Sequence, residues 1–304
     1  MTEVARGAAA DLDVATDLVG QPVLDRLVAL LDLEQIDENI YRGVSPAHSP
    51  VRVFGGQVAG QALVAAGRTV PSERKVHSLH AYFIRGGDPS VPIVYEVDRI
   101  RDGRSFTTRR VVGVQHGKAI FALSASFQIR EPGIEHQETM PEVPAPETLP
   151  TFAERIAGYP GLGGSREMPR PIDIRYVNDP PWVTRGSEDP SARNQVWMRA
   201  DGTLPDDDLL QVCVLTYASD MTLLDSPLAR HNVYWELDNV VGASLDHALW
   251  FHRPFRADEW FLYDTASPSA SGARALATGR FFAADGTQIA TVVQEGLLRV
   301  PQDR

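Results

Sequence analysis

One acidic side chain lies inside a run of mostly apolar residues in the C-terminal half of the chain. The run reads LTYASDMTLLD, residues 215–225, and Asp220 is the acid at its centre. An ionised carboxylate in such surroundings costs free energy unless it is exposed, paired or used in chemistry. An apolar setting raises the pKa of a carboxyl group and makes it a better general base toward water. Asp220 is therefore the first candidate for a catalytic group.

Other polar residues have suitable side-chain types but unsuitable spacing. Ser244, Asp246 and His247 fall within four residues of one predicted strand, where successive side chains point to opposite faces. The sequence has no G-x-S-x-G turn to expose a nucleophilic serine. We therefore expect no Ser-His-Asp triad and a structural role for His247. His77 and His80 are three residues apart in another predicted strand, so they should face opposite sides and form no metal pair.

Two helix-like segments would position these groups. Residues 54–70, FGGQVAGQALVAAGRTV, are rich in glycine and alanine. Each glycine costs roughly 1 kcal/mol in a helix interior, so this helix should be buried with its backbone pressed against a neighbour. Residues 204–224 start with Pro205 and three aspartates, which suit a first turn, and are then apolar on nearly every face. The first helix has no acid that could match Asp220.

The strand-like segments that follow each helix resemble one another. The matching pairs are HSLHAYFI (77–84) with SLDHALWFH (244–252), and residues 102–123 with residues 271–292. Two glycines stand 14 residues apart in both copies of the second pair, and the later ones, Gly117 and Gly286, fall in hairpin-like turns. Each half thus predicts an edge strand, a buried helix and four long antiparallel strands. A sheet wrapped around one helix is the hotdog architecture, and two copies make an α+β double hotdog.

Composition suggests how the chain is divided. We expect a disordered tail over residues 1–20 and an N-terminal hotdog domain over 21–130. Residues 131–171 are crowded with proline, glycine and acids, which predicts a linker with at most one short helix, near TLPTFAERIAG. Residues 172–304 should form the C-terminal hotdog domain that carries the catalytic residues.

Charge and composition exclude several kinds of partner. The 304 residues have a formal net charge of −11 and no run of lysine and arginine, so we expect no nucleic-acid partner. No apolar run reaches about 18 residues, so we expect no membrane span. The single cysteine, Cys213, allows no internal disulfide, and the N-terminus lacks the pattern of a signal peptide. These features favour a cytoplasmic protein.

Several long motifs resemble the acyl-CoA thioesterase II family of double-hotdog enzymes. They include VFGGQVAGQAL, VHSLHAYFIRGGDPSVPIVYEV, YASDMTLL, SLDHALWFHRPFRADEWFLYD and TVVQEGLLR, and the resemblance covers roughly residues 30–130 and 170–300. The resemblance implies hydrolysis of fatty acyl-CoA to free fatty acid and CoA, with acyl-CoA as the bound partner and no metal or cofactor. It also implies a homodimer or homotetramer.

The resemblance further implies three catalytic positions, an Asp, a Thr and a Gln that hold and activate water. These match Asp220 in YASDM, Ser244 in GASLDHALWFH and Gln294 in VVQEG. Ser244 departs from the family pattern, because it keeps the hydroxyl but lacks the methyl group that stiffens χ1 of threonine. Direct attack by the carboxylate, through a mixed anhydride, remains an alternative to attack by water.

The glycine-rich start of the first helix suggests how substrate is bound. Backbone N–H groups of Gly56 or Gln57 could polarise the thioester carbonyl, since the first turn of a helix has unpaired donors. Five arginines, which could meet CoA phosphates or form a solvated strand face, are Arg99, Arg101, Arg104, Arg109 and Arg110. Two other functions fit the same fold, a non-catalytic acyl-CoA-binding protein and a hotdog enoyl-CoA hydratase.

Overall fold

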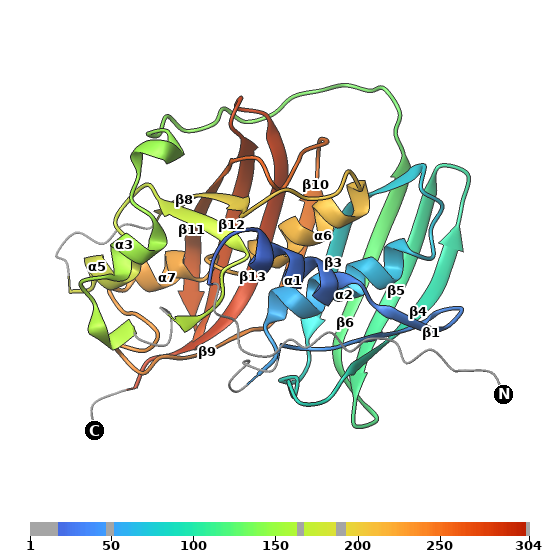
Figure 1. The fold of residues 1–304 in the computed structure, drawn as a ribbon, viewed down its shortest axis with the longest axis horizontal. Coiled ribbons are helices and arrows are strands. Elements are labelled where there is room, and N and C mark those ends of the chain that lie inside the picture. Colours follow the sequence, from blue (N-terminus) through green and yellow to red (C-terminus); the bar gives the residue numbers. More distant parts are fainter. Residues whose placement is uncertain (1–17, 47–51, 163–166, 187–192, 302–304) are drawn as a thin grey trace.

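One antiparallel sheet of 13 strands runs through the molecule (Figure 1). The computed structural model describes residues 18–46, 52–162, 167–186 and 193–301. The strand order is β1-β2-β4-β5-β6-β3-β10-β13-β12-β11-β8-β7, and β9 pairs with β13 beside this path. The strands of the first half are β1 (Glu34–Asp37), β2 (Ile40–Gly43), β3 (Arg74–Phe83), β4 (Ile93–Asp102), β5 (Phe106–Gln115) and β6 (Lys118–Ile129). Those of the second half are β7 (Ile172–Tyr176), β8 (Arg193–Ala200), β9 (Val241–Ser244), β10 (Asp246–Phe251), β11 (Phe261–Ser271), β12 (Arg274–Ala283) and β13 (Gln288–Arg299).

Strands β3 and β10 join the two halves at the centre of this sheet. They pair antiparallel, with His80 opposite Ala248 and Ala81 opposite His247. The two His-Ala dipeptides that the repeat predicts to be equivalent therefore face each other across the join. Gly117 and Gly286 form the β5–β6 and β12–β13 turns at φ 68° and φ 88°, a region that favours glycine. The double hotdog prediction is confirmed.

Two buried helices lie side by side against the sheet (Figure 1). They are α2 (Gly55–Gly67) and α6 (Asp208–Ser219), and they run antiparallel. A Cβ at Gly56 would lie 2.4 Å from the Tyr217 carbonyl oxygen, and one at Gly60 would lie 3.3 Å from that of Cys213. Glycine thus lets the two backbones approach closely, as the sequence of the first helix predicts.

Both helices are shorter than predicted, and the difference matters for Asp220. The second helix begins at Asp208 because the Asp207 carboxylate caps it, accepting hydrogen bonds from the backbone N–H of Leu209 at 2.8 Å and Leu210 at 3.3 Å. It ends at Ser219, so Asp220 is the residue that terminates the helix instead of lying within it. The chain then turns into α7 (Asp225–Arg230).

Shorter elements complete the fold. They are α1 (Gln21–Leu31), the 3-10 turns η1 (Pro146–Thr148) and η2 (Pro160–Leu162), α3 (Phe152–Ile156) and α5 (Pro181–Thr184). Of these, α1 packs against α2, while α3 packs against β7. Helix α3 is the short helix predicted within residues 131–171, and Thr151 with Glu154 forms its capping box. Of the predicted tail, residues 1–17 lie outside the described residues, and Leu18 O accepts a 2.8 Å hydrogen bond from Arg170 N. In the described part of the chain, no helix combines the length and the apolar character needed to cross a bilayer.

Candidate active site

Asp220 stands where the end of α6 meets the start of α2. The carbonyl end of one helix and the N–H end of the other therefore converge on its carboxylate. The carbonyl end of α6 disfavours a negative charge, whereas the N–H end of α2 favours it. The backbone N–H of Gly56 donates a hydrogen bond to the carboxylate. Asp220 also lines a cavity of about 530 Å³ whose wall includes Phe83, Met221 and Ser244.

Two side chains from neighbouring strands converge on one oxygen of this carboxylate. Ser244, at the end of β9, donates its hydroxyl proton to Asp220 Oδ1 at 3.1 Å. Gln294, on β13, donates from Nε2 to the same oxygen at 3.0 Å and to Ser244 Oγ at 2.6 Å. The structure thus brings together the three predicted catalytic residues from segments 24 and 74 residues distant from Asp220.

The pKa of Asp220 is raised above its ordinary value, and burial is the main cause. The hydrogen bonds from Gln294, Ser244 and Gly56 act in the opposite direction, because each stabilises the ionised form. Burial also lowers the pKa of the neighbouring His247 imidazole, which favours its neutral form. A desolvated carboxylate whose Oδ1 is held by Ser244 and Gln294 can take a proton on Oδ2.

His247 does not complete a nucleophilic triad with Ser244. Its Nε2 is 2.8 Å from Ser219 Oγ and its Nδ1 is 2.8 Å from Gln294 Oε1. Asp246 instead accepts a hydrogen bond from the Glu295 backbone N–H at 2.6 Å. The predicted absence of a triad and the structural hydrogen bonding of His247 are confirmed.

The prediction that His77 and His80 face opposite sides is wrong. A β-bulge after Val76 interrupts the two-residue alternation of β3. His77 Nε2 lies 2.8 Å from Ser126 Oγ, and His80 is opposite Ser124. Because Ser124 and Ser126 are two residues apart on β6, both imidazoles lie on the same face of the sheet.

The start of α2 is arranged differently from the sequence-based expectation. The Gly56 N–H, expected to face the substrate carbonyl, is directed at Asp220. The Gln57 side chain is 2% exposed and donates to Val44 O at 3.1 Å, and neither Gly56 nor Gln57 lines the cavity. Gly55 does line it, and a Cβ there would lie 2.6 Å from Asp220 Oδ2. The sequence-based prediction did not include Gly55, although Gly55 is the first residue of the Gly55-Gly56 pair.

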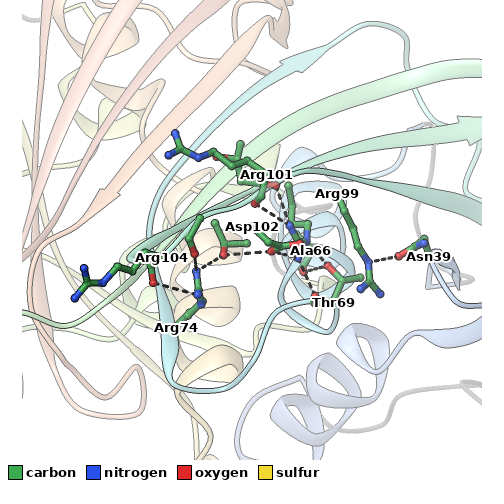
Figure 2. A network of polar contacts seen from close by, with 12 residues as sticks. Asn39, Ala66, Thr69, Arg74, Arg99, Arg101, Asp102 and Arg104 are labelled. Atoms are coloured by element: carbon green, nitrogen blue, oxygen red, sulfur yellow. Dashed lines mark hydrogen bonds and ion pairs between the residues drawn. The ribbon is translucent and has the colours of Figure 1, made fainter.

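The opposite end of the helix pair carries a network of polar contacts (Figure 2) and borders a second cavity, of about 1350 Å³, lined in part by Gly67, Asp208 and Leu209. Arg109 is 1% exposed, and its guanidinium donates to Thr69 Oγ1 at 2.8 Å, to Thr69 O at 3.1 Å and to Asp102 Oδ1 at 2.7 Å. It therefore closes the end of α2, about 20 Å from Gly55 at 1.5 Å per helical residue. Of the five arginines noted in the sequence, Arg109 is thus committed to the fold. The cations that line the cavity with Asp220 are Arg52 and Arg85.

A second acid at the cavity, Asp225, was not recognised from the sequence. Its side chain is 6% exposed and accepts hydrogen bonds from Tyr176 Oη at 3.1 Å and from the Trp235 side chain. Burial raises the pKa of Asp225 to about 7. The sequence signal was the Asp-Ser-Pro start of α7, which is typical of a helix N-terminus but gives no indication of burial.

We expect Asp225 to make the protein less stable as the pH rises from about 4 to about 7. In this window the folded state binds more protons than the unfolded state, so the free energy of unfolding falls with pH. The full loss is about 4 kcal/mol at 1.36 kcal/mol for each pKa unit. Chemical denaturation of Asp225→Asn should give a flatter pH dependence than wild type. Asp98→Asn, at an exposed position, should leave the slope unchanged; equal slopes for wild type and Asp225→Asn would contradict the prediction.

Comparison with known proteins identifies the class of enzyme. The family model described as acyl-CoA thioesterase matches residues 168–297, and that of the acyl-CoA thioesterase N-terminal domain matches residues 44–128. The chain is 42% identical to acyl-coenzyme A thioesterase 8 of Mus musculus, covering 93% of this chain and 92% of the mouse protein. It is 39% identical to acyl-CoA thioesterase 2 of Haemophilus influenzae, covering 91% and 98%.

A solved structure agrees with these sequence matches. The acyl-CoA thioesterase II of Mycobacterium marinum is 46% identical and superimposes with a TM-score of 0.75, covering 91% of this chain and 99% of that one. The chain belongs to the acyl-CoA thioesterase II family, and it is a thioester hydrolase.

Proposed function

We propose that the protein hydrolyses fatty acyl-CoA to free fatty acid and CoA at the cavity beside Asp220. The observation that carries this proposal is the convergence of Asp220, Ser244 and Gln294 within hydrogen-bonding distance at the cavity wall. The similarity to proteins named acyl-CoA thioesterases supports acyl-CoA as the class of substrate. The phosphates of CoA would meet Arg52 and Arg85 at the same cavity.

Asp220 is proposed as the general base. Its Oδ1 already accepts from Ser244 and Gln294, whereas Oδ2 faces Gly55. A water molecule near Oδ2 would lose a proton to Asp220 as its oxygen attacks the thioester carbonyl. Collapse of the tetrahedral intermediate breaks the C–S bond, and the proton held by Asp220 passes to the departing CoA sulfur. No metal or cofactor enters this sequence of steps.

The start of α2 is proposed to stabilise the oxyanion. Backbone donors in a first helical turn have no intrahelical acceptor, and of the first three residues of α2 it is Gly55 that lines the cavity. Gly56 contributes indirectly, through its hydrogen bond to Asp220. The sequence-based assignment of the carbonyl-binding donor to Gly56 or Gln57 is thereby revised to Gly55.

Release of free thiol from acyl-CoAs of increasing chain length tests the proposed activity. We expect the wild-type protein to release one thiol for each thioester consumed, because hydrolysis frees the CoA sulfur. An enoyl-CoA supplied in parallel should not be hydrated, since His247, the imidazole near Asp220, is buried and its two ring nitrogens face Ser219 and Gln294. Tight acyl-CoA binding without thiol release would favour a binding protein, and hydration without release would favour a hydratase.

The cellular setting is proposed from the family resemblance and composition. We expect a homodimer or homotetramer from the family resemblance, and a cytoplasmic location because the single cysteine is compatible with a reducing compartment. Light scattering on the purified protein measures the mass of that assembly, and a monomer would contradict the expectation.

A further inference from the structure

His247 lies behind the Asp220 site, between the end of α6 and strand β13. Its side chain is 1% exposed, with Nε2 2.8 Å from Ser219 Oγ and Nδ1 2.8 Å from Gln294 Oε1. A neutral imidazole has one N–H donor and one bare nitrogen acceptor, so its two contacts must differ in direction. The ring nitrogen of His247 that carries the proton therefore determines how the Gln294 amide is oriented.

The amide of Gln294 is the group whose orientation depends on this choice. Its Nε2 lies 3.0 Å from Asp220 Oδ1 and 2.6 Å from Ser244 Oγ, while its Oε1 faces His247. An ionised carboxylate only accepts hydrogen bonds, so an ionised Asp220 requires the NH₂ of Gln294 on its side. The amide oxygen must then accept from His247 Nδ1–H, and the bare Nε2 must accept the hydroxyl proton of Ser219.

The reverse arrangement would give a different site. If Ser219 directs its hydroxyl proton to Thr216 O, also 2.8 Å away, His247 must donate from Nε2 and leaves Nδ1 bare. Gln294 would then turn its NH₂ toward His247 and its oxygen toward Asp220. Two oxygens 3.0 Å apart are compatible only if Asp220 carries a proton, and a protonated Asp220 cannot act as the base.

We propose that His247 is a positioning residue that holds the NH₂ of Gln294 toward Asp220 and Ser244. The chain of donors runs from the Ser219 hydroxyl to His247, from His247 Nδ1–H to Gln294, and from Gln294 to Asp220. This inference rests on the proposed function, because it explains how the water-activating group is kept in its working form. His247 itself touches neither substrate nor the reacting atoms.

Nitrogen NMR of histidine-labelled protein tests the donor chain without substrate. The protein has eight histidines, so the His247 signals are assigned by their loss in His247→Asn. We expect the neutral Nδ1–H tautomer at neutral pH. The Nε2–H tautomer, or a doubly protonated ring, would overturn the inference whether or not the protein hydrolyses acyl-CoA.

A pair of substitutions tests the effect on turnover. In His247→Asn the amide NH₂ falls near the place of Nδ1 and can still donate to Gln294, whereas in His247→Gln it falls near Nε2 and cannot. We expect kcat to stay within about fivefold of wild type for Asn and to fall at least about 20-fold for Gln, with KM little changed in both. The acid limb of the pH profile should move to higher pH for Gln alone, because Asp220 loses a donor.

The thermal midpoints of the two variants separate positioning from packing. Both replacements remove the same ring from the core, so their losses of stability should be similar. Equal kcat values for the Asn and Gln variants would show that His247 only fills space, and would overturn the inference. In that case, hydrolysis by wild type that is lost in Asp220→Asn would still support the proposed function. If wild type itself does not hydrolyse acyl-CoA, the proposed function is wrong, and the NMR experiment still tests the donor chain.

Discussion

Replacing Asp220 by asparagine is expected to lower kcat for acyl-CoA hydrolysis by about 10³-fold, within the range that general bases contribute. Asparagine has nearly the same shape and can still accept the hydrogen bonds from Ser244 and Gln294, but it cannot take a proton from water. KM should change little, because Asp220 interacts most strongly with the reacting water. Thiol release under saturating acyl-CoA gives kcat directly.

The same substitution is expected to leave the protein at least as stable as wild type. Burial raises the pKa of Asp220, so its ionised form is held in the folded state at some cost, and a neutral side chain avoids that cost. A raised thermal midpoint with lost turnover would separate catalysis from folding. Asp98→Asn, on the exposed part of β4, is the matched control and should retain wild-type kcat.

The pH profile of the wild-type enzyme provides a further check on Asp220. Because the base must be ionised, kcat/KM should fall on the acid side with an apparent pKa above the ordinary aspartate value of about 3.9. A residual kcat within tenfold of wild type in Asp220→Asn, or an acid limb at the ordinary aspartate value, would contradict the assignment of Asp220 as a desolvated base.

The fold was predictable because its signals are local and occur twice. The turn residues Gly117 and Gly286 have positive φ. Each follows an earlier glycine, Gly103 or Gly272, by 14 residues, and this equal spacing indicates two equivalent hairpins. The excess of small residues in α2 has a similarly direct cause, since a Cβ at Gly56 would meet the backbone of α6 at 2.4 Å. A repeated constraint of this kind is visible in a single sequence without knowledge of the partner.

The details of the site depended on how segments far apart in the chain come together, and the sequence does not report this. Helix α6 begins later than predicted because Asp207 caps it, and it ends earlier, at Ser219. Asp220 is therefore a terminal residue that meets the first turn of α2. The bulge after Val76 reversed the face of His77 because one extra residue shifts the alternation of a strand. Asp225 resembles an ordinary helix-start acid until its burial is known.

The two ends of the helix pair carry different residues, so the proposed catalytic carboxylate has no counterpart at the other end. At one end, the C-cap of α6 is Asp220 and the facing helix start is glycine, so a carboxylate fits against backbone donors. At the other end, the C-cap of α2 is Arg68, which donates to Leu33 O at 2.6 Å and pairs with Asp32 at 2.5 Å. A paired cation therefore stands at the α2 end, where the α6 end has the carboxylate that we propose as the base.

Gly55→Ala is expected to lower kcat by about 10²-fold, because displacing a reacting group by about 1 Å can cost that much. The added methyl carbon would lie 2.6 Å from Asp220 Oδ2 and 2.9 Å from a ring carbon of Phe83. Oδ2 is the oxygen proposed to take the proton, and it must move to relieve the contact. The two neighbours are side-chain atoms, so they can shift without disturbing the backbone of α2.

Stability should therefore change much less than activity in Gly55→Ala. Alanine is favoured over glycine in a helix by roughly 1 kcal/mol, which offsets part of the steric cost. Gly158→Ala provides the control, since a Cβ at Gly158 meets nothing within 4 Å, and its kcat should equal that of wild type. Wild-type kcat in Gly55→Ala would mean that Oδ2 does not need the space beside α2, and the base would then have to act from its other oxygen. A parallel fall in kcat and thermal midpoint would instead show that Gly55 serves the packing of α2 against Phe83.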